Sequence, residues 1–478
     1  MARYPTGGHR RRHHGRRAHG LRPQQRCHRL AHTPDAGGHA MRLVLGLIAA
    51  LVLAAPARAA VEIQEITSAG GIDAWLVEES SIPFVALELR FRGGTSLDQP
   101  GKRGAINLMA ALLEEGAGDL SAQEFTARRE GLAASFDYDA YSDAISVSAQ
   151  FLTENRDEAV ALLRSSLIAP RFDEDAIERV RAQVLAGLRQ DEKDPDTIAN
   201  RAFMASAFGD HPYGSSGDGT VETVSALTRD DIVAAHRGTM TRDKLFVSAV
   251  GDIDAEALGA LLDTLLGDLP ETGFDAPPPA TYALQGGQTV IPFDTPQSVA
   301  VFGHEGLDRD DPDFITAYVV NEIMGAGSFE SRLMNEVREQ RGLTYGIYSY
   351  LAARDLAAMV MGRVASSNQT MAEAVDVIRA EWAKIAEQGI TAQELEDAKT
   401  FLTGSYPLRF DGNGPIANIL VGMQMDGLST DYVNDRNGMV DAITLEEANR
   451  VAARLYDPEA LHFVIVGQPE GLMDEASN

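Results

Sequence analysis

The sequence predicts an α+β protein built from two related halves, because it contains an internal repeat and mixes two periodicities. Residues 228–251 and 444–467 each begin with a threonine, continue through an amphipathic stretch and end in an apolar run closed by a glycine. The copies are offset by 216 residues at both ends, so a helix, a turn and a strand keep their lengths. Alternating apolar positions at residues 85–91 predict a strand, whereas other segments carry the helical period. Helices packed on a largely antiparallel sheet are expected in each half.

Capping signals mark where the repeated helices begin. Residues 228–231 read Thr-Arg-Asp-Asp and residues 444–447 read Thr-Leu-Glu-Glu. In such a capping box the hydroxyl and the acid satisfy free backbone amides at the helix start. A weaker echo joins residues 173–180 to residues 391–398, each a predicted helix entry after a turn.

The boundary between the halves is predicted from composition. Three prolines at 277–279 are followed by two glycines at 286–287, and a stiff stretch followed by a flexible one suits a linker. We therefore predict an N-terminal domain at residues 60–275, a linker at 276–288 and a C-terminal domain at 289–478.

The first 59 residues differ from the rest of the chain. Residues 1–40 hold nine arginines, seven histidines and one acid without apolar periodicity, so no packed element is predicted there. Residues 41–59 combine a charged start, an apolar run and Ala-Arg-Ala at 57–59, which is the pattern of a secretory signal peptide. The apolar run of about 13 residues is shorter than the roughly 20 that cross a bilayer, so a permanent anchor is the weaker interpretation. We expect cleavage after Ala59 and a periplasmic protein.

A signal peptide normally opens a protein, so we expect Met41 to be the true start and residues 1–40 to be a non-native extension. A genuine basic tail is the alternative. Twin-arginine export is a third interpretation, weakened because the arginine pairs at 11–12 and 16–17 lie well upstream of the apolar run.

The chain after residue 59 is strongly acidic. Removal of residues 1–59 takes away eleven of the 42 basic residues and one of the 70 acidic residues. This leaves 31 basic and 69 acidic residues, a net charge of −38. Such a charge disfavours nucleic acid and anionic membrane as partners and favours basic or neutral peptides. The only cysteine, Cys27, precedes the cleavage site, so no disulfide or thiolate ligand is expected. Four dispersed histidines remain, and for His211 we expect a structural hydrogen-bonding role.

Residues 87–116 contain a predicted strand, a glycine turn and an amphipathic helix with an apolar stripe at residues 108–113. This segment resembles the start of the pitrilysin/insulinase zinc peptidases, including their mitochondrial processing peptidase branch. In that family the helix carries His-x-x-Glu-His, whose histidines bind zinc and whose glutamate activates water. The resemblance spans roughly residues 62–470. It implies a fold of two homologous α/β-sandwich halves of the mitochondrial processing peptidase-like metallohydrolase type.

Laid on that pattern, the zinc positions of this chain are degenerate. Asn107 stands at the first histidine, Ala110 at the glutamate and Ala111 at the second histidine. The family's third ligand, a glutamate further along the chain, would fall at or next to Gly187, where no acid is present. Because an amide is a poor zinc ligand and alanine is none, the resemblance implies that ligands and general base are lost together and that this chain holds no metal of its own.

The second informative segment surrounds a glycine-rich loop with Gly325 and Gly327. The pattern predicts a helix after this loop that ends at Gly342, followed by a strand that includes Tyr345. Considered singly, Arg338 is explained as a cation near a helix C-terminus and Tyr345 as a strand aromatic.

Together these residues resemble the family's second-half signature, Ser-Arg-Leu followed by Glu-x-Arg-Glu-x-x-Gly-Leu-x-Tyr. The resemblance implies that Arg338 contacts peptide oxygens and that Tyr345 lies near the scissile carbonyl. Physically, a guanidinium fork and a phenol can stabilise charge that develops on a carbonyl oxygen. Gly325 and Gly327 correspond to a glycine loop implicated in substrate binding, although a plain turn explains them nearly as well.

These features predict the non-catalytic subunit of a heterodimeric periplasmic zinc metallopeptidase. A homologous partner subunit would supply zinc and water, and this chain would supply Arg338 and Tyr345 for peptide hydrolysis. A structural or binding homologue with no role in proteolysis is the alternative, and the retained pair speaks against it. An autonomous peptidase with an atypical metal site is a third hypothesis, disfavoured because the sequence shows no clustered ligands.

Overall fold

The computed structural model describes residues 62–326 and 330–472. The predicted extension (1–40), the predicted signal peptide (41–59) and Gly327 lie outside the described residues. Within the described ranges, none of the helices combines the length and the apolar character that crossing a membrane requires.

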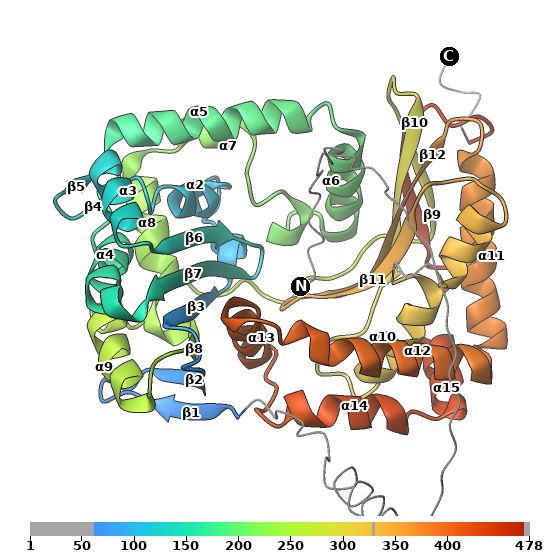
Figure 1. The fold of residues 1–478 in the computed structure, drawn as a ribbon. Coiled ribbons are helices and arrows are strands. Elements are labelled where there is room, and N and C mark those ends of the chain that lie inside the picture. Colours follow the sequence, from blue (N-terminus) through green and yellow to red (C-terminus); the bar gives the residue numbers. More distant parts are fainter. Residues whose placement is uncertain (1–61, 327–329, 473–478) are drawn as a thin grey trace, which may run out of the picture. The chain divides into compact units, whose positions relative to one another are not determined.

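Two sheets organise the chain (Figure 1). The first has six strands in the order β1-β2-β8-β3-β7-β6, and the second has five in the order β11-β12-β10-β13-β9. The first sheet consists of β1 (Gln64–Thr67), β2 (Asp73–Glu78), β3 (Phe84–Arg92), β6 (Ser135–Ala140), β7 (Ala144–Leu152) and β8 (Leu245–Gly251). The second consists of β9 (Gly287–Pro292), β10 (Gln297–Glu305), β11 (Ile347–Ala353), β12 (Ala358–Ser367) and β13 (His462–Gly467). The short strands β4 (Gly116–Ala117) and β5 (Leu120–Ser121) pair separately.

The two sheets share one topology. The order β2-β8-β3-β7-β6 corresponds to β9-β13-β10-β12-β11, with a parallel first pair and antiparallel neighbours after it. The repeated apolar runs of the sequence form the equivalent strands β8 and β13. Each ends in a glycine with positive φ, 142° at Gly251 and 149° at Gly467, where a side chain would overlap the neighbouring strand. The predicted α+β class with two homologous halves is confirmed.

Helices surround both sheets. In the first half they are α2 (Ala105–Ala111), α3 (Ala122–Gly131), α4 (Arg156–Ile168), α5 (Glu174–Asp191), α6 (Pro195–Phe208), α7 (Val221–Ala226), α8 (Arg229–Thr239) and α9 (Ala255–Leu266). In the second they are α10 (Phe314–Gly325), α11 (Met371–Gln388), α12 (Ala392–Ser405), α13 (Asn413–Met425), α14 (Tyr432–Ala442) and α15 (Leu445–Leu455). Short helical stretches are η1 (Gly94–Leu97), η2 (Thr153–Asn155), η3 (Pro212–Gly214), η4 (Arg242–Lys244), η5 (Met334–Glu339) and η6 (Tyr406–Arg409).

The predicted capping boxes form differently in the two repeats. At α8 the hydroxyl of Thr228 and the carboxylate of Asp231 satisfy each other's backbone amides, as predicted. At α15 the hydroxyl of Thr444 accepts from the amide of Glu447, but the carboxylate of Glu447 accepts a 3.2 Å bond from the hydroxyl of Thr316 instead. Tertiary packing against α10 therefore redirects one half of the second box.

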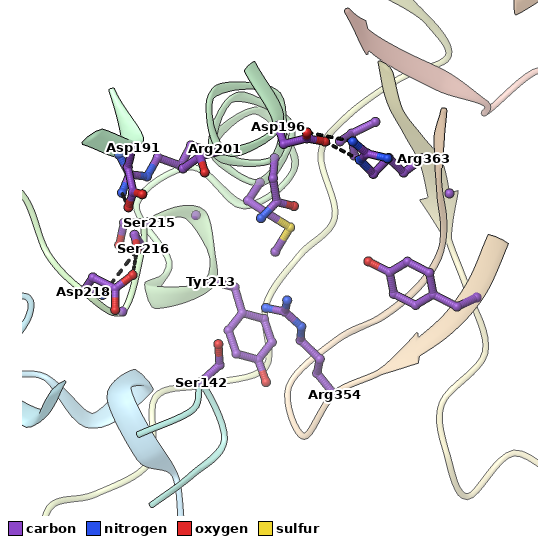
Figure 2. A pocket seen from close by; sticks show the side chains of 18 of the residues that line it. Ser142, Asp191, Asp196, Arg201, Tyr213, Ser215, Ser216, Asp218, Arg354 and Arg363 are labelled. Atoms are coloured by element: carbon purple, nitrogen blue, oxygen red, sulfur yellow. Dashed lines mark hydrogen bonds and ion pairs between the residues drawn. The ribbon is translucent and has the colours of Figure 1, made fainter. Parts of the chain in front are cut away.

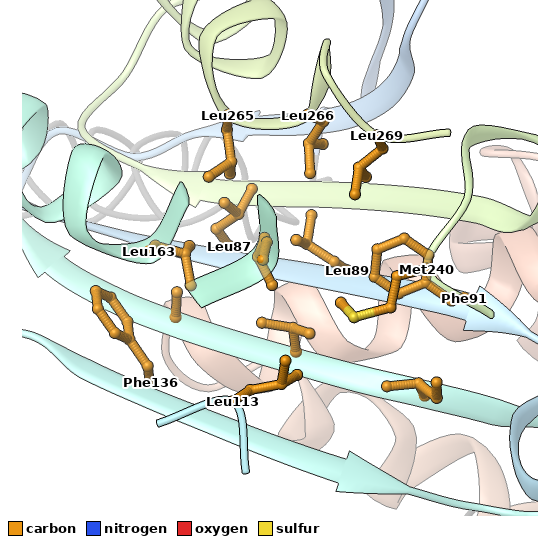
Figure 3. Packing of buried hydrophobic residues seen from close by; sticks show 14 of the residues in the cluster. Leu87, Leu89, Phe91, Leu113, Phe136, Leu163, Met240, Leu265, Leu266 and Leu269 are labelled. Carbon is orange, nitrogen blue, oxygen red and sulfur yellow. The ribbon is translucent and has the colours of Figure 1, made fainter. Parts of the chain in front are cut away.

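The main core of the first half lies between β3 and its helices (Figure 3). Leu87, Leu89 and Phe91 point from β3 toward Leu163 of α4 and Leu265 of α9, and all are buried. The alternation read from the sequence is thus the inward face of a strand. The equivalent core of the second half lies on the corresponding face of the second sheet, under α10, α11 and α15.

The reverse face of the first sheet is covered by a helix of the second half. Ala417 and Leu420 of α13 pack on Ala86 of β3 and Val250 of β8. The hydroxyl of Ser248 donates a 2.6 Å hydrogen bond to the carbonyl of Ala417. This contact satisfies a buried polar group across the boundary between the halves.

The reverse face of the second sheet is covered in the same way by α6 of the first half. Phe203 and Ala207 pack against Val301 of β10, Met361 of β12 and Val464 of β13. Figure 1 shows α6 on one side of this sheet and α11 on the other. The halves therefore exchange helices, and the central strands β8, β10 and β13 are buried on both faces only because the other half is present.

Residues 276–286 of the predicted linker (276–288) have no regular secondary structure, whereas its last two residues begin β9. It is nevertheless held in place, since the amide of Ala283 donates to the carbonyl of Ala207 at 2.8 Å. His211 accepts at Nδ1 from the amide of Tyr213 (3.1 Å), so its Nε2–H donates to the carbonyl of Pro278 (3.0 Å). The structural role expected for His211 is confirmed.

The exchange of helices makes a testable prediction about stability. Phe203→Ala removes a fully buried ring from α6 and should lower the free energy of unfolding by about 3–5 kcal/mol through lost burial and a residual cavity. Because α6 belongs to one half and its contacts to the other, urea unfolding followed by circular dichroism should still show one transition. Phe401→Ala, at an exposed ring, is the control and should change stability little. A small loss for Phe203→Ala, or two separate transitions, would contradict this view of the fold.

Candidate functional site

The helix at the predicted zinc position, α2, is fixed at its start by a buried carboxylate. The side chain of Asp98 accepts hydrogen bonds from the amides of Gly104 and Ile106, both at 2.9 Å, and lies 3.3 Å from Arg103. Burial raises the pKa of Asp98 to about 6, against the opposite influence of these donors. Gly104, with a φ of 96°, bends the chain into the helix.

The structure places the four degenerate zinc positions on two helices that contact each other, α2 and α5. Asn107 is half-buried, Ala110 is buried, and Ala111 and Gly187 are exposed. A zinc site needs three nitrogen, sulfur or oxygen ligands from the protein, and these four positions offer one amide. They do not fit a zinc ion. Elsewhere among the described residues, no group of three histidine, cysteine or acidic side chains could hold a metal ion.

The segment that carries Arg338 is a π-helix, η5, and not the α-helix expected from the sequence. The amide of Gln340 bonds to the carbonyl of Asn335, five residues back, at 2.9 Å. Gly342 closes the segment with a φ of 66°, and its amide bonds to the carbonyl of Arg338 at 2.8 Å. The predicted end at Gly342 is therefore correct, whereas the hydrogen-bond pattern before it is of a rare type often found at functional sites.

Gly325 has a packing reason to be glycine. It is the last residue of α10, and a Cβ there would come within 2.8 Å of the Leu333 side chain and 3.0 Å of the Ser349 amide. Because Gly325 has no Cβ, α10, β11 and the residue before η5 can approach one another closely. The role in substrate binding implied by the family resemblance stays a prediction.

The arginine of the Ser-Arg-Leu motif anchors this segment to α12. Arg332 donates from Nε and Nη2 to the two carboxylate oxygens of Glu394, at 2.6 and 2.9 Å, and from Nη2 to the carbonyl of Gly389 at 2.9 Å. Burial by itself raises the pKa of Glu394, but the hydrogen bonds from Arg332 and then from Thr391 outweigh it and bring the pKa to about 2. One carboxylate therefore caps α12 and holds the segment that leads to Arg338.

Tyr345 lies before the strand and not within it, which corrects the prediction from the sequence. β11 begins at Ile347, because the hydroxyl of Thr344 holds a bend by bonding both to the backbone two residues on and to the neighbouring strand β12. It accepts from the amide of Gly346 at 3.1 Å and donates to the carbonyl of Ala365 at 2.6 Å. The bend turns Tyr345 outward, and 89% of this residue is exposed.

Arg338 is also accessible, with 33% of its side chain exposed and its Nε 3.4 Å from the carboxylate of the adjacent Glu339. The structure thus places Arg338 and Tyr345 at accessible positions on one segment, on either side of the glycine turn at Gly342. What the two side chains bind remains the prediction made from the family resemblance.

A pocket of about 620 Å³ lies where α6 and the loop after η3 face β11 and β12 (Figure 2). Two ion pairs line it. Arg363 of β12 donates twice to the carboxylate of Asp196 on α6, with the Nη2 bond at 2.7 Å. Arg201 donates to Asp191 at 3.1 Å.

Tyr213 forms the floor of this pocket beside Arg354. Its buried hydroxyl donates to the carboxylate of Asp143 and accepts from the amide of Leu356 at 3.1 Å. Burial raises the pKa of both Tyr213 and Asp143, so the phenol keeps its proton at neutral pH. The guanidinium of Arg354 lies 5.0 Å from the centre of the Tyr213 ring.

Sequence reasoning missed this pocket. Its walls come from six separate segments of both halves, and each residue has an ordinary surface or strand explanation when considered alone. The one lead in the sequence was His211, which lies two residues before the lining residue Tyr213.

Comparisons with known proteins agree with this architecture. The family model described as insulinase (peptidase family M16) matches residues 75–220, and the model described as peptidase M16 inactive domain matches residues 226–402. Among curated proteins, a "non-peptidase homolog YmxG" of Helicobacter pylori is 29% identical over 81% of this chain and 90% of its own length. An "uncharacterized zinc protease" of Mycobacterium leprae is 28% identical over 64% of this chain and 70% of its own.

Solved structures show the same fold. The crystal structure of a peptidase M16 inactive domain from Pseudomonas fluorescens superposes with a TM-score of 0.79, at 27% identity, over 85% of this chain and 98% of its own. A protease from Helicobacter pylori does so with a TM-score of 0.77 at 16% identity, over 85% of this chain and 99% of its own, which supports the fold alone. With family models matching successive parts of both halves, the chain belongs to the insulinase family of peptidases, peptidase family M16.

Proposed function

We propose that this chain is the non-catalytic subunit of a heterodimeric zinc metallopeptidase of the periplasm. A homologous partner subunit with an intact His-x-x-Glu-His motif supplies the zinc and the activated water. This chain supplies Arg338 and Tyr345 to the shared site. The name of the Helicobacter pylori relative, a non-peptidase homolog, supports a non-catalytic role for this chain as well.

The observation that carries the proposal is the exposure of Tyr345. Tyr345 keeps 89% of its surface accessible to water although it stands next to an ordered strand. Tyrosine is enriched at interfaces because it combines an apolar ring with a hydroxyl group. The phenol is free to donate to an oxygen of a bound peptide, which is the role that the family resemblance implies.

The lack of ligands on α2 supports the division of labour. Asn107, Ala110 and Ala111 offer neither the imidazoles nor the carboxylate that zinc hydrolysis requires. A guanidinium and a phenol can stabilise charge on a carbonyl oxygen but cannot activate water by themselves. Each subunit would therefore hold half of the chemistry, and peptide hydrolysis would require both.

The location in the periplasm rests on the signal-peptide pattern of residues 41–59. N-terminal sequencing of the protein exported from its host checks it, since cleavage after Ala59 leaves Ala60 as the first residue. A mature protein that begins upstream of Met41 would contradict both the signal peptide and the proposed start.

Mixing this chain with a family member that carries an intact zinc motif tests the shared site. The purified chain should be free of zinc and silent toward peptides alone, and should be required for cleavage when a family member that carries His-x-x-Glu-His is added. Arg338→Ala and Tyr345→Phe should each lower kcat/KM of the mixture at least about 100-fold, as expected when a donor to a developing oxyanion is removed. Complex formation, measured by analytical ultracentrifugation, should be unchanged.

Matched controls on this chain are Arg341→Ala, three residues from Arg338 and paired with Glu336, and Tyr432→Phe, a half-buried tyrosine of α14. Both should leave the activity of the mixture intact. If Arg338→Ala and Tyr345→Phe behave like these controls, the chain is a structural or binding homologue. Stoichiometric zinc or cleavage by this chain alone would overturn the non-catalytic assignment.

The anchor between Arg332 and Glu394 predicts a dependence of stability on pH. The pKa of Glu394 is depressed to about 2 in the folded chain from its ordinary 4.5, so its stabilising contribution is fully present above about pH 5 and is lost as pH falls through the folded pKa. Glu394→Gln should therefore lower the free energy of unfolding by about 1–3 kcal/mol at pH 7. The difference from the parent should vanish near pH 2, as measured by urea unfolding across pH.

Glu396→Gln provides the control for this measurement, because Glu396 lies on the same helix and is exposed. A stability loss for Glu394→Gln that is the same at pH 7 and pH 3 would show that the carboxylate charge does not hold the segment.

A further inference from the structure

We propose that the pocket between α6 and β11 is a second binding site of this chain, which takes a carboxylate of a peptide through Arg354. That the ligand is a peptide rests on the proposed function. That it carries a carboxylate rests on the charges and contacts of the pocket alone.

The lining arginines of the pocket differ in whether an acid pairs with them. Of its three arginines, Arg363 is held by Asp196 and Arg201 by Asp191. Arg354 differs, because no carboxylate among the described residues lies within ion-pair distance of its guanidinium. Arg354 is the lining arginine whose donors remain available to a ligand.

The Tyr213 ring supports the guanidinium of Arg354. This guanidinium lies 5.0 Å from the centre of the Tyr213 ring, and that ring is fixed by its bonds to Asp143 and to the amide of Leu356. A guanidinium stacked on a fixed aromatic ring loses little further freedom when it binds, so its fork of donors is prepared for a planar acceptor. A carboxylate is the planar group that matches two of these donors at once.

The other charges that face this position do not exclude an anion. The carboxylate of Asp143 interacts electrostatically with Arg354, but it already accepts from the Tyr213 hydroxyl. Asp355, next along the chain, lies 3.5 Å from Arg92. The lining acid Asp218 accepts from the hydroxyl of Ser216 at 3.0 Å.

The remaining walls suit the side chain that precedes a peptide carboxylate. Tyr348 and Tyr350 project from β11 into the pocket with ring centroids 6.1 Å apart, and each is about two-fifths exposed. Met204 of α6 and Val301 of β10 also line it. The pocket volume of about 620 Å³ lies within the range of sites that bind small ligands or a few residues of a peptide.

The charge of the whole chain restricts the ligand further. With a net charge of −28, and a more negative value after signal cleavage, the protein repels anions at long range. The favoured ligand is therefore a peptide that is basic overall and carries one carboxylate for Arg354. Both a C-terminal carboxylate and an acidic side chain provide this group.

The site lies close to the proposed shared site along the chain. Tyr350, in the pocket, follows Tyr345 by five residues, which span at most about 17 Å of extended chain. A peptide of roughly six residues is long enough to reach from one to the other. The pocket would then hold the end of the peptide whose bond is broken beside Tyr345.

The test uses the purified chain without any partner subunit. Isothermal titration at low salt compares three peptides: N-acetylated Lys-Ala-Lys-Ala-Phe with a free carboxylate, the same peptide as its C-terminal amide, and the amide with Asp in place of Phe. The free acid should bind at least about tenfold more tightly than its amide, as expected for loss of a charge-assisted bidentate pair. Arg354→Gln should reduce the free acid to the affinity of the amide and leave the amide unchanged.

Arg128→Gln is the control, since Arg128 is an exposed arginine outside the pocket that pairs with Glu158. Thermal unfolding should show that both variants remain folded, and Arg354→Lys, which keeps the charge without the fork, should recover part of the affinity. Binding of the Asp amide that also depends on Arg354 supports the site and shows that a side-chain carboxylate suffices.

Equal affinity for acid and amide, a preference that survives Arg354→Gln, or no binding of any peptide at millimolar concentration would overturn the proposal. Because the experiment involves neither a partner nor cleavage, its failure would leave the roles proposed for Arg338 and Tyr345 untouched. An inactive mixture of subunits would equally leave this site untouched.

Discussion

The rest of the structure depends on the burial of both faces of each sheet by helices from both halves. Each half covers only one face of its sheet with its main core helices. These are α4 and α9 in the first half and α10, α11 and α15 in the second. The other face is closed by α13 on the first sheet and by α6 on the second. Because strands such as β13 are buried on both sides, neither half could stand alone without exposing a large apolar surface. The exchange makes one cooperative body from two repeated units.

The same exchange creates the pocket. α6 reaches the second sheet with its apolar side on β10 and β13, and its polar side is left facing β11 and the loop after η3. The ion pair between Asp196 and Arg363 ties the start of α6 to β12, and the bond from Tyr213 to Asp143 ties the following loop to the first sheet. A cavity lined by six segments is therefore held open by contacts that also join the halves. The residues around Arg354 are therefore held in place by contacts between distant segments of the chain.

Two places in the chain bear on the proposed function. On α2 the positions that the family resemblance assigns to zinc carry one amide and two alanines, which do not suit the ion, while the helix keeps its packing. At residues 331–345 the segment is anchored strongly, through Arg332 and Glu394, yet it presents Tyr345 to solvent. Rigid support beneath an exposed donor is the arrangement expected of a group that acts on a bound molecule, because a pre-positioned donor needs no reorganisation when charge develops. The exposure of Tyr345 is compatible with the binding role that the family resemblance implies.

The sequence by itself determined the repeat, the α+β class, the inward face of β3 and the glycine turn at Gly342, because each is a pattern of period, capping or residue type. That the zinc positions are degenerate is a prediction from the family resemblance. Only the tertiary structure decided that α6 and α13 cross to the other half, that Glu447 leaves its capping box for Thr316, and that the bond from Thr344 to Ala365 of β12 keeps Tyr345 out of the strand. These outcomes are set by contacts between residues far apart in the chain. The pocket around Arg354 is the clearest case, since its walls come from segments that nothing in a linear pattern joins.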